Sequence, residues 1–203
     1  MVRASFKSGL GFGSLLLLFC LTSIRPQDSS SLVETGHIEV AGHPTPYLIR
    51  HLPVSSFPQL PPTVQDQLGR RGCLIPQTYE AHAPENVVNA SLERHGSSDW
   101  AVLCSVNGIV SLLVFFSSNN GNPAVLATSA ETERLQAHGS TGVLGFNWGI
   151  DPASPDEIHQ AQLGMRTLPP RLDHDALADS IIDGKTVYHL YSKNTWAVVG
   201  TQD

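Results

Sequence analysis

The sequence predicts an α+β domain, with a central antiparallel sheet of hairpins covered by two short helices. Three observations lead to this prediction. An apolar hairpin pattern surrounds Asn107-Gly108, a second hairpin pattern surrounds Lys193-Asn194, and two helix-start patterns follow Pro61 and Ser154. With 203 residues, of which 41% are hydrophobic, the chain is long enough for a single packed domain.

The first hairpin, residues 100–116, is the strongest of these signals. Asn107-Gly108 separates two apolar runs, and both residues tolerate the positive φ that a two-residue hairpin turn requires. Such a turn pairs Val106 with Ile109 and Cys104 with Ser111. Because both faces of the hairpin are apolar, we expect both to be covered, with Cys104 buried between layers.

The second hairpin, residues 186–201, has an aromatic pair beside its turn. A two-residue loop at Lys193-Asn194 would place Tyr191 opposite Trp196, although the absence of a glycine also permits a longer loop. We expect this hairpin to lie in the same central sheet as residues 100–116.

Two short helices are predicted to cover the sheet. Residues 63–70 follow a proline pair and place Val64 and Leu68 one turn apart on the buried side. Residues 155–164 begin with a capping box, in which Ser154 is the N-cap and Glu157 its partner.

The N-terminus predicts export. Residues 1–23 carry Arg3 and Lys7 before an apolar run, which is typical of a secretory signal peptide and is short for a bilayer span of ~20 residues. Alternatives are an uncleaved membrane anchor and lipidation at Cys20. We therefore divide the chain into a signal peptide (1–23), a linker (24–36) and one domain (37–203), secreted or periplasmic.

Cys73 and Cys104 remain after removal of that segment. An even number of cysteines in an exported chain favours a disulfide, and closing their loop would stabilise the fold by roughly 3–4 kcal/mol. A nucleophilic Cys104 or a pair of free buried thiols are the alternatives. The apolar strand around Cys104 offers nothing that would activate a thiolate.

Few other residues indicate chemistry. Asp173-His174-Asp175 could serve as a metal-binding or acid–base cluster, or could be a solvated loop. Trp148, in a predicted glycine-rich loop, is a candidate ligand contact, with packing onto the core as the alternative. Asn89 begins a glycosylation sequon that matters only in a eukaryotic source. No motif predicts a catalytic residue, a resident metal or a cofactor.

The charge of the chain limits its partners. A formal net charge of −6 without a basic stripe argues against nucleic acid. A protein or an envelope component is the expected partner, and a membrane is expected only if residues 1–23 are retained. The leading functional hypothesis is a non-enzymatic binding domain. The alternative is a secreted hydrolase that uses Asp173, His174 and Asp175.

The segments "RRGCLIPQ", "DWAVLCS" and "NTWAVVG" together resemble a group of uncharacterised exported bacterial proteins. The resemblance spans roughly His37 to the C-terminus. It implies export and the pairing of the two cysteine segments, and it implies no activity.

Overall fold

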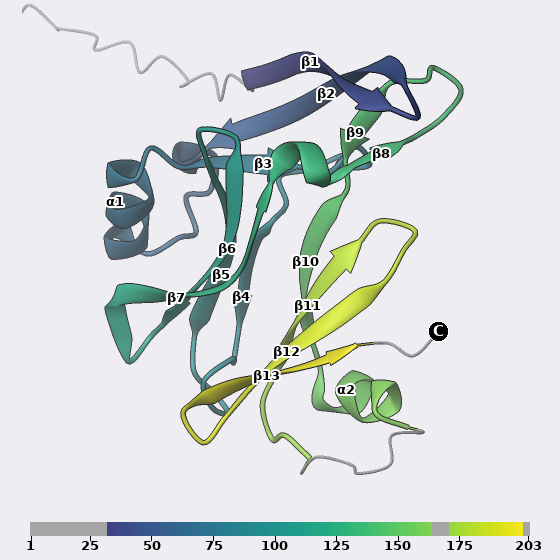
Figure 1. Ribbon diagram of the computed structural model, residues 1–203. Helices are drawn as coiled ribbons and strands as arrows, with labels where there is room; N and C mark the ends of the chain where they lie inside the picture. The colour runs from purple at the N-terminus through teal and green to yellow at the C-terminus, as the bar shows by residue number, and fades with distance from the viewer. Residues whose placement is uncertain (1–31, 164–170, 201–203) are drawn as a thin grey trace, which may run out of the picture.

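The chain folds into two stacked β-sheets, each with one short helix (Figure 1). This computed structural model describes residues 32–163 and 171–200. The predicted signal peptide, residues 1–23, lies outside the described residues. The strands are β1 (Leu32–Val40), β2 (His43–Pro53), β3 (Leu74–Gln77), β4 (Val87–Ala90), β5 (Asp99–Val106), β6 (Ile109–Phe116), β7 (Asn119–Ala130), β8 (Leu135–Ala137), β9 (Leu144–Phe146), β10 (Trp148–Ala153), β11 (Ala176–Ile181), β12 (Thr186–Ser192) and β13 (Thr195–Gly200).

The larger sheet has the strand order β7-β6-β5-β3-β2-β9-β8, with β1 paired to β2 and β4 paired to β5. Its pairs are antiparallel except that β2 and β9 run parallel. The smaller sheet has the order β10-β11-β12-β13. The expectation that both hairpins share one central sheet is therefore wrong, and the fold is dominated by strands.

The two hairpins separate because each has an apolar face that can be buried by stacking. Leu103 and Leu112 of the large sheet pack in one core with Trp148, Ile150 and Leu177 of the small sheet. Stacking face to face buries these side chains on both sheets, whereas joining edge to edge would leave them exposed.

The helices do not cover one sheet together. Helix α1 (Pro62–Arg70) packs on the other face of the large sheet, where Val64 and Leu68 are fully buried beside the disulfide. Helix α2 (Pro155–Ala161) buries Ile158 against the small sheet. The predicted capping box between Ser154 and Glu157 is present. Two 3-10 turns, η1 (Val54–Ser56) and η2 (Glu131–Glu133), complete the described helices.

Both hairpin registers are confirmed. Val106 pairs with Ile109 and Cys104 with Ser111 across a turn in which Asn107 and Gly108 have positive φ. Tyr191 pairs with Trp196 across Lys193-Asn194, which also adopt positive φ. The turn without glycine is therefore still a two-residue turn.

Strand β1 begins at Leu32, so residues 32–36 of the predicted linker are β-strand. The strand forms because β2 is long enough to pair with it as far as His51. Tyr47 packs over Gly36, where a Cβ would lie 2.6 Å from the tyrosine hydroxyl oxygen. Residues 32–36 are mostly exposed and carry no hydrophobic alternation that could predict a strand there.

The disulfide between Cys73 and Cys104 is confirmed, with a Cα–Cα distance of 5.3 Å and both residues buried. It joins the segment after α1 to the centre of β5. Among the described residues, no helix has the length and apolar character needed to cross a bilayer.

Candidate functional site

The three residues of Asp173-His174-Asp175 do not converge. The Asp173 carboxylate is 83% exposed and lies 2.8 Å from Nδ1 of the buried His174. Nε2 of His174 lies 2.9 Å from the carbonyl oxygen of Tyr191. With both ring nitrogens hydrogen-bonded, His174 has no lone pair directed at a metal or a substrate.

Asp175 faces away from this pair and links two loops. Its carboxylate accepts a hydrogen bond from the Ser91 amide, and its own amide donates to the Ser91 carbonyl, each at 3.0 Å. Neighbouring residues in an extended segment point to opposite sides, so this division is the ordinary outcome. The arrangement gives no geometric support to hydrolysis at this cluster.

Trp148 is not on an exposed loop, so the expectation of a surface ligand contact is wrong and the alternative, packing onto the core, is confirmed. It lies in β10, is fully buried, and has the Arg134 guanidinium 4.1 Å above its ring. Its indole nitrogen donates to Asp179 at 2.6 Å, and the other Asp179 oxygen lies 3.0 Å from Nε2 of His189. The buried indole needs a hydrogen-bond acceptor, which Asp179 supplies from the neighbouring strand.

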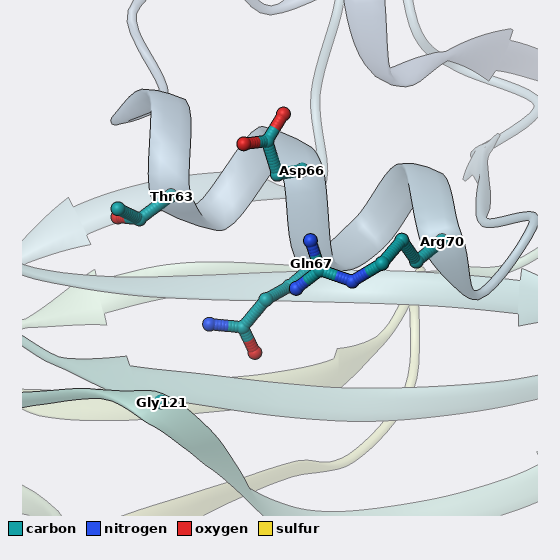
Figure 2. Close-up of a pocket in the computed structure, with 5 residues that line it drawn as sticks. All are labelled: Thr63, Asp66, Gln67, Arg70 and Gly121. Atoms are coloured by element: carbon teal, nitrogen blue, oxygen red, sulfur yellow. The ribbon is translucent and has the colours of Figure 1, made fainter.

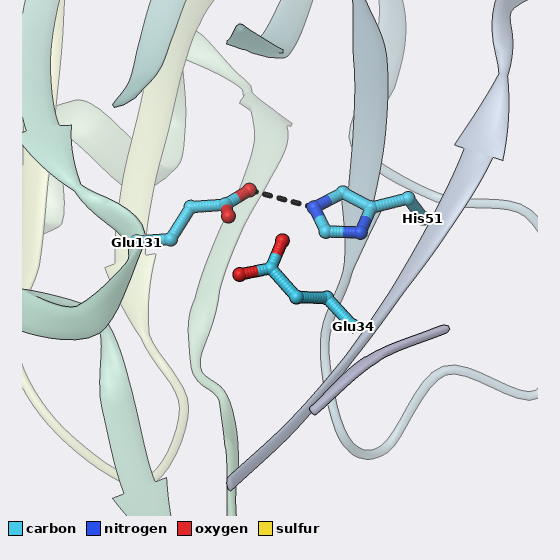
Figure 3. Close-up of side chains that lie close together, drawn as sticks. All are labelled: Glu34, His51 and Glu131. Carbon is cyan, nitrogen blue, oxygen red and sulfur yellow. Dashed lines mark hydrogen bonds and ion pairs between the residues drawn. The ribbon is translucent and has the colours of Figure 1, made fainter. Parts of the chain in front are cut away.

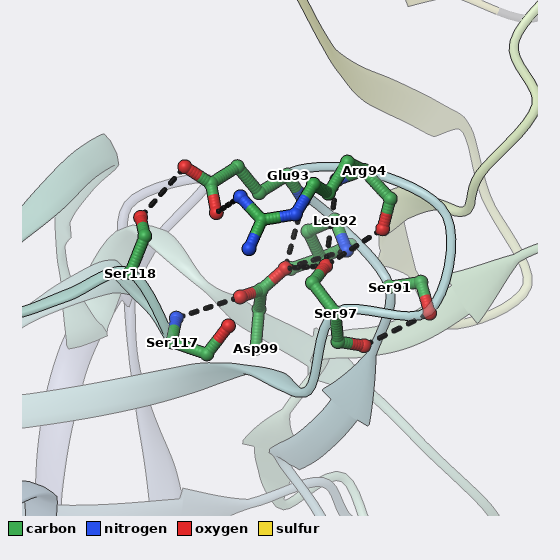
Figure 4. Close-up of polar contacts among 8 residues, drawn as sticks. All are labelled: Ser91, Leu92, Glu93, Arg94, Ser97, Asp99, Ser117 and Ser118. Carbon is green, nitrogen blue, oxygen red and sulfur yellow. Dashed lines mark hydrogen bonds and ion pairs between the residues drawn. The ribbon is translucent and has the colours of Figure 1, made fainter.

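Asp99 is a second buried carboxylate with a structural role (Figure 4). One oxygen accepts the amides of Leu92 and Glu93 and the hydroxyl of Ser97, at 2.5–2.9 Å. The other oxygen accepts the Ser117 amide at 2.7 Å. Asp99 thus fixes the loop between β4 and β5 to the turn after β6, and both of its oxygens are occupied.

Asn89, the first residue of the sequon, is an exposed residue of β4. Its side-chain amide donates to the Ser98 hydroxyl and to the Asp99 carbonyl, each at 3.0 Å. The side chain therefore helps to close the same loop that Asp99 fixes.

The deepest acid–base pair is His51 with Glu131. Nε2 of His51 lies 2.7 Å from Oε1 of Glu131, and both side chains are buried. Burial alone would raise the pKa of Glu131. Hydrogen bonding from His51 and Ser105, together with the charge of His51, outweighs burial and lowers that pKa below its ordinary value of 4.5. Sequence reasoning missed this pair because its members are 80 positions apart.

Two hollows lie where α1 faces β6 and β7. One hollow, of about 250 Å³, is formed by the flank of α1 and by Gly121 of β7 (Figure 2). In this view Gln67 points toward the strand that carries Gly121, and Asp66 points away from it. A second hollow, of about 310 Å³, lies beside Arg71, and its lining includes Cys104, Val106, Ile109, Ser111, Leu113 and Val125. We call these two hollows the α1–β7 groove.

The α1–β7 groove combines apolar surface with positive charge. Ile109 and Val125 are 47% and 57% exposed at its rim. Arg70 and Arg71 are exposed beside it, and within the described residues neither guanidinium is ion-paired. Sequence reasoning placed α1 correctly but assigned no role to its exposed flank, because a short polar flank carries no motif.

Comparison with known proteins adds no assignment to this geometry, since the chain matches no family model, no curated protein and no solved structure. The functional reading therefore depends on the groove and on the polar clusters themselves.

Proposed function

We propose that this chain is an exported binding domain that holds an acidic, partly apolar segment of a partner protein in the α1–β7 groove. The observation that carries the proposal is the placement of two arginines, neither of them ion-paired within the described residues, beside the exposed apolar rim residues Ile109 and Val125, on a chain of net charge −6. Carboxylates of the partner would pair with Arg70 and Arg71, and its apolar side chains would cover Ile109 and Val125.

The chemistry of the groove favours this partner over a basic one. An acidic surface normally attracts basic segments over long range, but Arg70 and Arg71 give this region a local charge of the opposite sign. Exposed arginines next to apolar side chains are a common composition of protein interfaces, where the guanidinium pairs with carboxylates in a planar, bidentate geometry.

The disulfide supports the exported part of the proposal. Disulfides persist in oxidising compartments, and the Cys73–Cys104 bond joins two buried segments of the fold. The charged-then-apolar pattern of residues 1–23 and the resemblance to exported bacterial proteins agree with this location. Intact-mass analysis of the protein recovered outside the cytoplasm tests it, since a cleaved signal peptide removes about the first 23 residues.

The binding proposal is tested by fluorescence anisotropy with a labelled peptide of alternating Glu and Leu residues. A peptide of the same length with Lys in place of Glu measures the charge preference. We expect the acidic peptide to bind at least about tenfold more tightly than the basic one, and its affinity to fall as salt is added.

Variants locate the binding site. Arg71→Glu and Val125→Asp should each weaken binding of the acidic peptide by about tenfold or more. Val198→Asp is the matched control, because Val198 is equally exposed, at 60%, but lies in β13 of the other sheet. Equal losses for Val125→Asp and Val198→Asp, or no preference for the acidic peptide, would refute the proposal.

A further inference from the structure

Three side chains from distant parts of the chain point toward one another above the large sheet (Figure 3). Glu34 comes from β1, His51 from β2 and Glu131 from η2. One ligand atom from each lies within 4.8 Å of the other two, the one such grouping of three among the described residues. We call this the Glu34–His51–Glu131 cluster.

The cluster contains a buried oxygen that lacks a hydrogen bond. Glu131 is 2% exposed, and its Oε1 faces Nε2 of His51 while its Oε2 has no hydrogen-bond partner. The nearby Ser105 hydroxyl interacts with the carboxylate but does not reach Oε2 with hydrogen-bond geometry. Folded proteins rarely leave a buried carboxylate oxygen unsatisfied, and a bound cation is one way to satisfy it.

The second carboxylate makes the need for a cation stronger. In Figure 3 the carboxylate of Glu34 points toward the space between Glu131 and His51. Two carboxylates that face each other repel unless a proton or a positive ion lies between them. His51 alone compensates only one of the two.

Strand pairing between β1 and β2 places Glu34 and His51 close together. Glu34 pairs with Ile49 and Leu32 pairs with His51, so Glu34 and His51 share one face of the β1–β2 ladder, one diagonal step apart. The Tyr47 hydroxyl donates to Oε1 of Glu34 at 3.3 Å and orients that carboxylate. These contacts act as the outer support that ordinarily orients metal ligands.

Glu131 is fixed from the other side. Its amide donates to the Gly108 carbonyl at 2.9 Å, which ties η2 to the turn between β5 and β6. The cluster therefore has two buried ligands, His51 and Glu131, and one exposed ligand, Glu34.

We propose that Glu34, His51 and Glu131 form a binding site for a divalent transition-metal ion of the zinc class, with a fourth position open to solvent. One imidazole nitrogen and two carboxylate oxygens are ligands that Zn²⁺ accepts, and three protein ligands with one open position are typical of exchangeable or catalytic zinc sites. Tetrahedral zinc places its ligand atoms about 3.4 Å apart. To reach that geometry the Nε2–Oε1 distance of 2.7 Å would lengthen by about 0.7 Å, and the other spacings, which are at most 4.8 Å, would shorten by up to about 1.4 Å.

Metal binding replaces the hydrogen bond between His51 and Glu131. The charged imidazole releases its Nε2 proton to solvent, the Nε2 lone pair then binds the ion, and the ring becomes neutral with its remaining proton on Nδ1. The cation takes over the role of the displaced proton between the imidazole and the Glu131 carboxylate. The proposal does not depend on the α1–β7 groove, which lies beside α1 and involves none of these three residues.

The test is titration of the metal-stripped full chain with Zn²⁺ alone. Calorimetry measures the affinity and the number of ions bound, and thermal unfolding measures the melting temperature with and without the ion. We expect one Zn²⁺ per chain, a rise in melting temperature on binding, and little competition from Ca²⁺, which prefers sites made entirely of oxygen. Titration with Co²⁺ in place of Zn²⁺ should give visible absorption bands whose intensity reports a four-coordinate site.

Glu34→Gln is the decisive variant, because Glu34 is exposed and its replacement leaves the buried pair intact. It should bind Zn²⁺ at least about tenfold more weakly, with an unchanged melting temperature in the presence of EDTA. Glu39→Gln, which replaces an exposed glutamate of the same strand, is the matched control and should bind as the wild type does.

His51→Gln should abolish the Co²⁺ bands if it folds. Equal Zn²⁺ affinity for wild type, Glu34→Gln and Glu39→Gln would overturn the proposal, as would binding that leaves the melting temperature unchanged. Either result would assign any bound zinc to the scattered surface histidines.

Discussion

Reduction of the Cys73–Cys104 disulfide should lower the free energy of unfolding by about 3.7 kcal/mol. The two cysteines are separated by 31 positions, and the chain-entropy relation gives about 12 cal/mol/K for closing a loop of that length. At 25 °C this corresponds to about 3.7 kcal/mol, a large part of the 5–15 kcal/mol that is usual for a domain.

The location of the disulfide explains why its reduction should lower the free energy of unfolding by the full entropic amount. Both cysteines are buried in the core that α1 forms with the large sheet, and reduction removes no atom from that core. Packing in the folded state therefore changes little, and the effect comes from the greater freedom of the unfolded chain. The same freedom should raise the dependence of unfolding free energy on denaturant, since the reduced chain exposes more surface on unfolding.

The assay is urea unfolding with and without a phosphine reductant, followed by tryptophan fluorescence, with free thiols counted in each state. Thiol labelling of the native, oxidised protein should modify neither Cys73 nor Cys104. Coincident unfolding curves for the oxidised and reduced chains would refute the argument that this bond constrains the unfolded state.

Three further outcomes follow from the polar contacts of Asp99, Trp148 and His174. Asp99→Asn turns one acceptor oxygen into a donor that faces backbone amides, and should lower the free energy of unfolding by about 2–4 kcal/mol in urea. Trp148→Phe removes the donor to Asp179 and should cost about 1–3 kcal/mol, measured in the same way. The hydrogen bond from His174 holds the pKa of Asp173 below its ordinary 3.8. The pair therefore stabilises the fold above pH 3.8 and ceases to do so as pH falls through the lowered pKa, and NMR titration should find the Asp173 pKa back near 3.8 in His174→Gln.

Local signals predicted local structure well in this chain. Asn107-Gly108 fixed the register of β5 and β6, and the capping box at Ser154 located the start of α2. In both cases a few neighbouring residues set the backbone angles, so the information lies within a short window. The pairing of Cys73 with Cys104 was predictable for a different reason, since the predicted signal peptide contains the third cysteine, Cys20, and the remaining two permit one intramolecular disulfide.

The partition into two sheets was not predictable in this way. The sequence of the hairpin at residues 186–200 shows an apolar face that must be covered, but it does not say whether a second sheet or a helix covers it. The placement of Trp148 differs between the predicted arrangement and the observed one. If Trp148 belonged to a loop, as predicted, the small sheet would lack its first strand. In the structure Trp148 belongs to β10, where it pairs with Ile181 and packs against the large sheet.

The candidate metal cluster could be predicted only if the position of one turn were known. The predicted linker, residues 24–36, excludes Glu34 from the fold and gives no reason to place it beside His51. The structure has its turn at Ala41-Gly42, which pairs Val40 with His43 and carries the ladder back to Leu32 opposite His51. Since side chains alternate along a strand, this register alone decides that Glu34 and His51 share a face. In a sheet-rich chain, neighbours in sequence such as Asp173, His174 and Asp175 tend to diverge, and residues that converge must be sought across a ladder whose turn is known.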